Sequence, residues 1–389
     1  MGSHLPKFEC SFSVTHRNSD QHARVGHLKT AHGELETPCF LPIASNGTLR
    51  AISFEEAIEC GTRIIMANAW HIYREAGPEK LRELGGVHHL MKWPGPLVTD
   101  SGGYQVFSLR DTSKITEDGV AFESAVESLT PESVVEMQKC LGSDVMFVLD
   151  DCAPYPCSKQ RALEAVERTT SWAKRCMSAH KSLPRQYDHP QVLWGIIQGG
   201  AFKSLRKQSA EEVSRLGFDG YGIGGLSIGM SRSLIREMTV LTCESLPQDK
   251  PRHLLGVGLP WQVLDGVEDG VDSFDCVLPI RKAQRGLAYT AFGEVLYKHA
   301  PQPKDADLPL DPECDCSTCK KYTRQQLRDI YIKEKPVAGH LAVIHNIWYY
   351  HKLLERTRAA IREDRFLDFK EEAMLKWFPA TDGIPGKMK

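Results

Sequence analysis

Short apolar, β-branched runs alternate with longer amphipathic stretches over most of the chain. The runs lack a strict apolar–polar alternation, so we expect parallel strands that are covered on both faces. The predicted strands are 38–43, 63–69, 97–100, 144–150, 192–198, 221–225, 253–257 and 273–278, and the clearest predicted helices are 131–141, 159–180, 201–216, 234–245 and 261–270. Eight strands alternating with helices predict an α/β fold, a (β/α)₈ TIM barrel, with a doubly wound open sheet as the alternative.

Almost every predicted strand ends in a polar residue or a glycine. These strand-end residues are Asn68, Asp100, Asp150, Gln198, Gly225, Gly256 and Asp275. One such residue commonly reflects turn chemistry alone. In a barrel, however, they all converge on the carboxyl-terminal face, where active sites lie.

The segment VDSFDCVLPIRKAQR, residues 271–285, combines a buried strand with a charged continuation. We expect Pro279 to end the strand and a polar loop to follow, carrying Arg281, Lys282 and Arg285. A carboxylate at the strand end beside these cations suits a nucleophile that meets an anionic substrate. The alternative for Asp275 is a structural capping role.

Three strand-end acids, Asp100, Asp150 and Asp275, are candidates for chemistry. Two carboxylates that flank a glycosidic bond can cleave it, one at the sugar carbon and the other on the proton of the leaving group. Neighbouring glycine pairs allow a flat ligand close to the backbone. They match no dinucleotide or phosphate-loop fingerprint.

Composition narrows the function classes. The chain has 389 residues, 41% of them hydrophobic, and a net charge of −2, so any contact with nucleic acid requires a local basic patch. No apolar run has the length of a membrane span, and the first residues lack the apolar core of a signal peptide. Scattered cysteines then indicate a reducing, cytoplasmic location. We divide the chain into a partly tag-like segment 1–24, a barrel 25–300, a subdomain with C-terminal helices that complete the barrel 301–378, and a tail 379–389.

Cys314, Cys316 and Cys319 form a C-x-C-x-x-C cluster, and His345 lies in an apolar stretch downstream. Three thiolates on one loop and an imidazole from a helix can close a tetrahedral structural zinc site. From the pattern alone, His340 and His351 are alternatives for the fourth ligand. Free thiols beside a core histidine are the alternative to a metal site.

An ordered set of motifs resembles the tRNA-guanine transglycosylases, and the bacterial-type, queuosine-forming branch in particular. The motifs are TDSGGYQ (99–105), LDDCAPYP (149–156), GIIQGG (195–200), GFDGYGIGGL (217–226), HLLGVG (253–258), FDCVLP (274–279) and DPECDCSTC (311–319). The resemblance runs from about residue 24 to about residue 370. It implies a (β/α)₈ barrel with a zinc-binding insert near the C-terminus.

The resemblance also implies a reaction and a set of roles. The wobble guanine (position 34) of GUN-anticodon tRNAs is exchanged for a free 7-deazaguanine base, through a covalent intermediate between an aspartate and ribose. Asp275 matches the nucleophile and Asp100 the general acid/base. The other implied residues are Asp150, Gln198, Gly225, Leu226, Tyr104, Leu255, Cys152 and Ser101 for the base, Arg281, Lys282 and Arg285 for tRNA, and Cys314, Cys316, Cys319 and His345 for one structural Zn²⁺ per chain. A cytoplasmic homodimer without membrane contact is expected.

Three departures from the family pattern concern specificity. Ile280 and Gln284 replace residues that help to recognise the anticodon loop, and Met230 replaces a glutamate. Loss of that charge argues against a cationic 7-substituent, whereas the bulk of Ile228 argues against a large one. We favour the aminomethyl base preQ1 over queuine. A non-catalytic tRNA-binding subunit and a barrel glycosidase that acts on free carbohydrate are the competing functions.

Overall fold

The computed structural model describes residues 10–18, 22–102, 113–122 and 128–378. Its main sheet has nine parallel strands in the order β4-β14-β13-β12-β11-β10-β7-β6-β5. The strands are β4 (Cys39–Leu41), β5 (Ile43–Ala44), β6 (Ile65–Asn68), β7 (Leu97–Asp100), β10 (Val145–Phe147), β11 (Val192–Ile197), β12 (Gly220–Ile223), β13 (Arg252–Leu254) and β14 (Ser273–Asp275). Each lies within, or within one residue of, a predicted strand.

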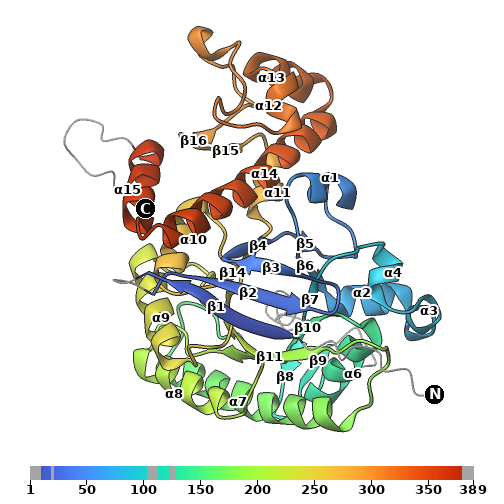
Figure 1. Ribbon diagram of the computed structural model, residues 1–389. Coiled ribbons are helices and arrows are strands. Elements are labelled where there is room, and N and C mark those ends of the chain that lie inside the picture. The colour runs from blue at the N-terminus through green and yellow to red at the C-terminus, as the bar shows by residue number, and fades with distance from the viewer. Residues whose placement is uncertain (1–9, 19–21, 103–112, 123–127, 379–389) are drawn as a thin grey trace.

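The two ends of this strand order are pieces of one extended stretch. Only Pro42 separates β4, which pairs with β14, from β5, which pairs with β6. A proline lacks the N–H that a sheet ladder needs, so Pro42 divides the stretch into two strands. The sheet therefore closes through this stretch, and the predicted barrel is confirmed (Figure 1).

Helices surround the sheet. Those of the barrel are α1 (Phe54–Glu59), α2 (Ala69–Ala76), α3 (Pro78–Leu84), α4 (Val87–Met91), α6 (Pro131–Leu141), α7 (Lys159–Ser182), α8 (Lys203–Ser214), α9 (Arg232–Ser245), α10 (Pro260–Glu268) and α11 (Leu278–Gln284), and a short hairpin, β8 (Ser113–Ile115) with β9 (Val120–Phe122), lies between β7 and α6. Within the described residues, no helix is both long enough and apolar enough to cross a membrane.

One local prediction was wrong. The segment after the last barrel strand is helix α11, whereas we predicted a charged loop. Pro279 lies in its first turn, where the missing N–H has no helical partner to lose. The strand itself ends at Asp275, earlier than predicted. Arg281 and Lys282 therefore lie on a helix, which fixes the directions in which their side chains leave the backbone.

The N-terminal segment also contains more structure than its weak pattern predicted. An antiparallel sheet is formed by β1 (Ser11–Arg17), β2 (Arg24–Thr30) and β3 (Gly33–Thr37). The buried Arg24 guanidinium donates to the Asp272 carboxylate at 2.9 and 2.5 Å, directly before β14. This sheet therefore covers the amino-terminal end of the barrel, opposite the predicted site.

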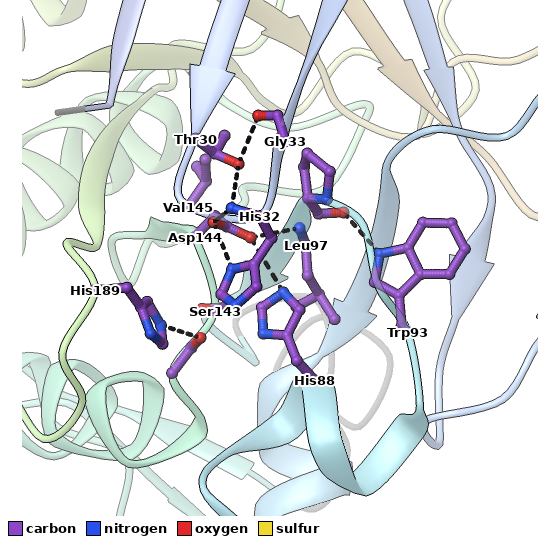
Figure 2. A network of polar contacts seen from close by, with 12 residues as sticks. Thr30, His32, Gly33, His88, Trp93, Leu97, Ser143, Asp144, Val145 and His189 are labelled. Atoms are coloured by element: carbon purple, nitrogen blue, oxygen red, sulfur yellow. Dashed lines mark hydrogen bonds and ion pairs between the residues drawn. The ribbon is translucent and has the colours of Figure 1, made fainter. Parts of the chain in front are cut away.

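A second contact at this end joins the β2–β3 turn to β10. Figure 2 shows the fully buried Asp144 carboxylate at the edges of the His32 and His88 rings, where one nitrogen of each ring lies 2.9 and 3.1 Å, respectively, from one of its two oxygens. The backbone N–H groups of His32 and Leu97 donate to the same oxygens at 3.2 and 2.9 Å. Four donors thus satisfy this carboxylate and fix the turn to the barrel.

These three side chains are also close enough for a metal site. The rings of His32 and His88, however, stack at 3.5 Å with an interplanar angle of 14°. A ring nitrogen directs its lone pair in the plane of the ring, and two nearly parallel planes share no point close to both nitrogens. We therefore interpret the cluster as a hydrogen-bonded clamp.

Replacement of Asp144 by Asn should lower the free energy of unfolding by about 1–3 kcal/mol, because the new NH₂ faces an N–H donor inside the protein. Burial raises the pKa of Asp144, but the hydrogen bonds from His32 and His88 outweigh it and hold that pKa below its usual value of 3.8. Its stabilising contribution is therefore present above pH 3.8 and is lost as the pH falls further. Urea unfolding at pH 7 and pH 3 tests this. The exposed Asp188→Asn is the control, and equal midpoints for the two variants would contradict the clamp.

The C-terminal part forms a separate layer beside α11. Its elements are β15 (Ala288–Thr290), β16 (Gly293–Val295), a 3₁₀ turn (Pro303–Asp305), α12 (Ser317–Lys321), α13 (Arg324–Lys333), α14 (Lys335–Arg362) and α15 (Phe366–Trp377). The long helix α14 runs from this layer along the barrel (Figure 1). Its Tyr350 hydroxyl donates to the Gly258 carbonyl, and Arg358 donates to the Pro38 carbonyl at 2.8 Å. The proposed domain boundaries stay a prediction.

Candidate active site at the carboxyl end of the barrel

Asp100 ends β7 and is held from the neighbouring strand. The Asn68 amide donates to one carboxylate oxygen at 2.8 Å, and the N–H groups of Ala69 and Gly102 donate to the other at 3.2 and 3.3 Å. Burial nevertheless raises the pKa of Asp100 to about 7, and the charge of Asp275 adds to the increase. A carboxyl group with this pKa can both give and take a proton at neutral pH.

Asp275 ends β14 and is 6% exposed. Its Oδ1 accepts two hydrogen bonds, from His253 Nε2 at 2.9 Å and from the Gly256 N–H at 3.0 Å. Within the described residues, its Oδ2 accepts none. The carboxylate is thus fixed through one oxygen, and the other remains available for chemistry.

Asp150 and Gln198 follow the neighbouring strands β10 and β11. The Gln198 amide donates to Asp150 Oδ2 at 2.7 Å. Burial raises the pKa of Asp150 to about 6, and this hydrogen bond opposes the increase. Gly225 has a φ of 71°, and a Cβ there would lie 2.6 Å from Gln198 Oε1. A glycine is therefore required at this position, and together these groups offer hydrogen-bond donors and acceptors suited to the edge of a base.

Arg206 was missed by the sequence reasoning. Its guanidinium is fully buried and donates to the carbonyls of Ile197, Gly200 and Gly224 at 3.0, 3.1 and 2.6 Å. Burial lowers the pKa of Arg206 to about 10. The side chain ties together the ends of β11 and β12, where the predicted base-reading residues lie. The sequence around it, KSLRKQ (residues 203–208), is typical of an exposed helix face, so nothing in it indicated a buried arginine.

The remaining predicted base contacts lie around this end of the barrel. Leu226 and Ser101 are buried, whereas Leu255 and Cys152 are partly buried. Tyr104 lies outside the described residues.

The predicted RNA contacts lie on or directly after α11. Arg281 and Arg285 are exposed and Lys282 is half-buried; in the described part of the chain, none of them forms an ion pair within 4.0 Å. Ile280 is only 4% exposed, so its side chain belongs to the core. Position 280 therefore contributes to packing beneath α11 and not to its exposed cationic surface.

The cysteine cluster selects His345 among the three candidate histidines. His345 Nδ1 lies 3.4, 3.7 and 3.3 Å from the sulfurs of Cys314, Cys316 and Cys319. Its Nε2 lies 2.8 Å from the Tyr289 carbonyl. A carbonyl only accepts, so Nε2 carries the proton and the Nδ1 lone pair faces the sulfurs. This Cys₃His set could hold a metal ion and has the donors of a structural zinc site.

Asn346, the residue after His345, contacts helix α11, which carries Arg281 and Lys282. Asn346 donates from its amide to the Pro279 carbonyl at 2.8 Å, and its oxygen accepts the N–H of Tyr289 at 2.9 Å. The Cys₃His cluster and the first turn of α11 are thus contacted by consecutive residues of α14.

Comparison with known proteins agrees with this geometry. The family model described as queuine tRNA-ribosyltransferase matches residues 19–379. The queuine tRNA-ribosyltransferase of Pelotomaculum thermopropionicum is 44% identical over 372 residues, which cover 94% of this chain and 98% of the relative. Those of Caldanaerobacter subterraneus (44% identical, covering 94% of this chain and 97% of the relative) and Lysinibacillus sphaericus (42% identical, covering 94% and 96%) are also similar to this chain. The chain therefore belongs to the queuine tRNA-ribosyltransferases, the pentosyltransferase family of tRNA-guanine transglycosylases.

Proposed function

We propose that this enzyme exchanges the wobble guanine of GUN-anticodon tRNAs for a 7-deazaguanine through a covalent bond between Asp275 and ribose. The observation that carries the proposal is the contrast between the two acids at one end of the barrel. Asp100 can hold or release a proton near pH 7, whereas Asp275 is fixed by two N–H donors with one oxygen free. These are the environments that an acid/base and a nucleophile need.

In the first half-reaction, an oxygen of Asp275 forms a bond to ribose C1′ as the bond from C1′ to N9 of guanine breaks. Asp100 gives its proton to the departing guanine. In the second, Asp100 takes the N9 proton of the incoming base, which attacks C1′ and releases the Asp275 carboxylate. One glycosidic bond replaces another, and protons and charge balance without a further co-reactant.

The other groups supply recognition. The polar edge of the flipped base is placed against Asp150, Gln198 and the backbone at Gly225. Arg281, Lys282 and Arg285 lie in reach of phosphates that flank the reacting nucleotide. We place the reaction in the cytoplasm, where its tRNA substrate is found, and expect a homodimer.

Incorporation of labelled guanine into a tRNA with a GUN anticodon tests the proposal. We expect exchange on tRNA and no hydrolysis of aryl glycosides. Glycoside cleavage without exchange would point to a carbohydrate enzyme, and tRNA binding without exchange to a non-catalytic subunit. The two acids favour the catalytic function because a binding subunit needs neither.

The incoming base is tested by offering preQ1, queuine and guanine to one anticodon stem-loop. We propose preQ1, because the bulk of Ile228 argues against a larger 7-substituent; the loss of a carboxylate at Met230 argues against a cationic substituent and is outweighed in this proposal. Met230 is 8% exposed, so its side chain occupies the space of a buried group. Exclusive use of queuine would contradict this choice.

We propose that the metal of the Cys₃His cluster is zinc and that it holds the C-terminal layer together. Cys316→Ser should lose the metal and make residues 301–334 at least about tenfold more sensitive to protease, because a structural zinc site contributes on the order of 10 kcal/mol to folding. Metal analysis and limited proteolysis measure both effects. Cys157→Ser, which changes a thiol outside the cluster, is the control. An unchanged cleavage rate in a zinc-free variant would contradict the structural role.

A further inference from the structure

We propose that His253 is a positioning residue that selects the attacking oxygen of Asp275. The inference rests on the proposed function, because it assigns a task to the histidine behind the proposed nucleophile. His253 was not among the residues that the sequence indicated.

The strand register places the three side chains in line. His253 on β13 pairs with Ser273 on β14. Ser273 and Asp275 are two residues apart, so both side chains leave the same face of β14. The imidazole of His253 spans this pair, with Nδ1 2.8 Å from the Ser273 hydroxyl and Nε2 2.9 Å from Asp275 Oδ1.

For the uncharged form of the ring, the partners define the tautomer. An ionised carboxylate only accepts hydrogen bonds, so Nε2 carries the proton that faces Asp275. Nδ1 then holds the lone pair and accepts the hydroxyl hydrogen of Ser273. The Asp275 carboxylate thus sets the tautomer, and the hydrogen bond from Ser273 anchors the other side of the ring.

Packing fixes the ring in space as well. His253 has no exposed surface, and the Phe147 ring lies against it with centroids 5.6 Å apart. A ring that cannot turn holds its N–H in one direction. Together with the Gly256 N–H at 3.0 Å, it occupies Oδ1 from two sides.

The consequence is an asymmetric nucleophile. Oδ1 is held by two donors, whereas Oδ2 accepts no hydrogen bond from the described residues. The structure assigns the bond to ribose C1′ to Oδ2. His253 stops the carboxylate from turning, so that this oxygen faces the substrate before the reaction begins.

Two substitutions separate positioning from packing. The amide nitrogen of glutamine reaches about as far as Nε2, so His253→Gln keeps a donor to Oδ1. The shorter asparagine reaches only the position of Nδ1, so His253→Asn loses it. Both changes replace a buried ring by a primary amide, and a role in packing alone would affect them similarly.

We expect His253→Asn to lower kcat for guanine exchange, and the rate of adduct formation, by about tenfold to a hundredfold, as when a supporting hydrogen bond to a reacting group is removed. KM for tRNA should stay within about twofold, since His253 is fully buried, and a ground-state binding defect would instead raise KM alone. His253→Gln should recover most of the rate. Equal losses in the two variants, or no loss in either, would overturn the inference.

Asp275→Asn distinguishes this inference from the proposed function. If that variant still forms an adduct, the nucleophile itself is wrongly assigned. If it forms none while both His253 variants react at the wild-type rate, only the positioning role fails. Should circular dichroism show that His253→Asn is unfolded, Ser273→Ala decides: we expect a kcat about threefold to tenfold lower with KM unchanged, because the ring loses the hydrogen bond that anchors its Nδ1 side, and an unchanged kcat would overturn the proposal.

Discussion

Asp275→Asn is expected to abolish the denaturant-resistant adduct with tRNA and to lower base exchange by on the order of 10⁴-fold, the scale seen when a member of a covalent catalytic unit is removed. An amide is a poor nucleophile for a sugar carbon. The substitution also brings an NH₂ group toward donors, because His253 and Gly256 both direct N–H groups at Oδ1. The side chain is then expected to turn, with its remaining oxygen toward these donors.

The measurement is a denaturing gel of enzyme incubated with tRNA, together with guanine exchange on the same samples. Asp249→Asn is the control, since Asp249 is exposed and precedes β13 at the opposite end of the barrel. Circular dichroism establishes that both variants are folded. A retained adduct in Asp275→Asn would remove the central assumption of the mechanism.

Asp100→Asn is expected to lower kcat by about 10²- to 10⁴-fold, the usual contribution of a general acid/base. Burial raises the pKa of Asp100 to about 7, so the wild-type group is protonated below that pH and ionised above it. Release of the first base requires the protonated form. The single-turnover rate of guanine release should therefore fall as the pH rises through 7.

The asparagine variant should lose this pH dependence as well as the rate. Single-turnover guanine release measured between about pH 5.5 and 9 tests both effects, with Asp249→Asn again as the control. A variant that is slow but keeps the wild-type pH profile would show that another group handles the proton.

The sequence predicted the structure well where an acidic residue follows a buried apolar strand. Buried parallel strands are short apolar, β-branched runs without apolar–polar alternation, so the barrel was predictable. Asp100, Asp150 and Asp275 each lie at or near the end of such a run, so their position at one end of the barrel was predictable too. Helix α11 was not, because Pro279 ends a strand and begins a helix equally well. The antiparallel sheet that begins at Ser11 was missed because its first strand carries almost no apolar pattern.

Arg206 and His253 show a different limit. Both are polar residues whose partners are distant in sequence or are backbone carbonyls. Arg206 binds three carbonyls at the ends of two strands, and His253 joins two side chains of the neighbouring strand. Such roles depend on which strands pair and in which register, which no local pattern encodes.

The adjacency of His345 and Asn346 on α14 has a consequence for how the proposed zinc would affect RNA binding. The first residue faces the three sulfurs, and the second holds the Pro279 carbonyl at the start of the helix that carries Arg281 and Lys282. Metal loss that disturbs this turn of α14 would also displace those cations. Affinity for RNA should then decline in step with metal occupancy during chelation, while the carboxylates at the ends of β7 and β14 keep their places.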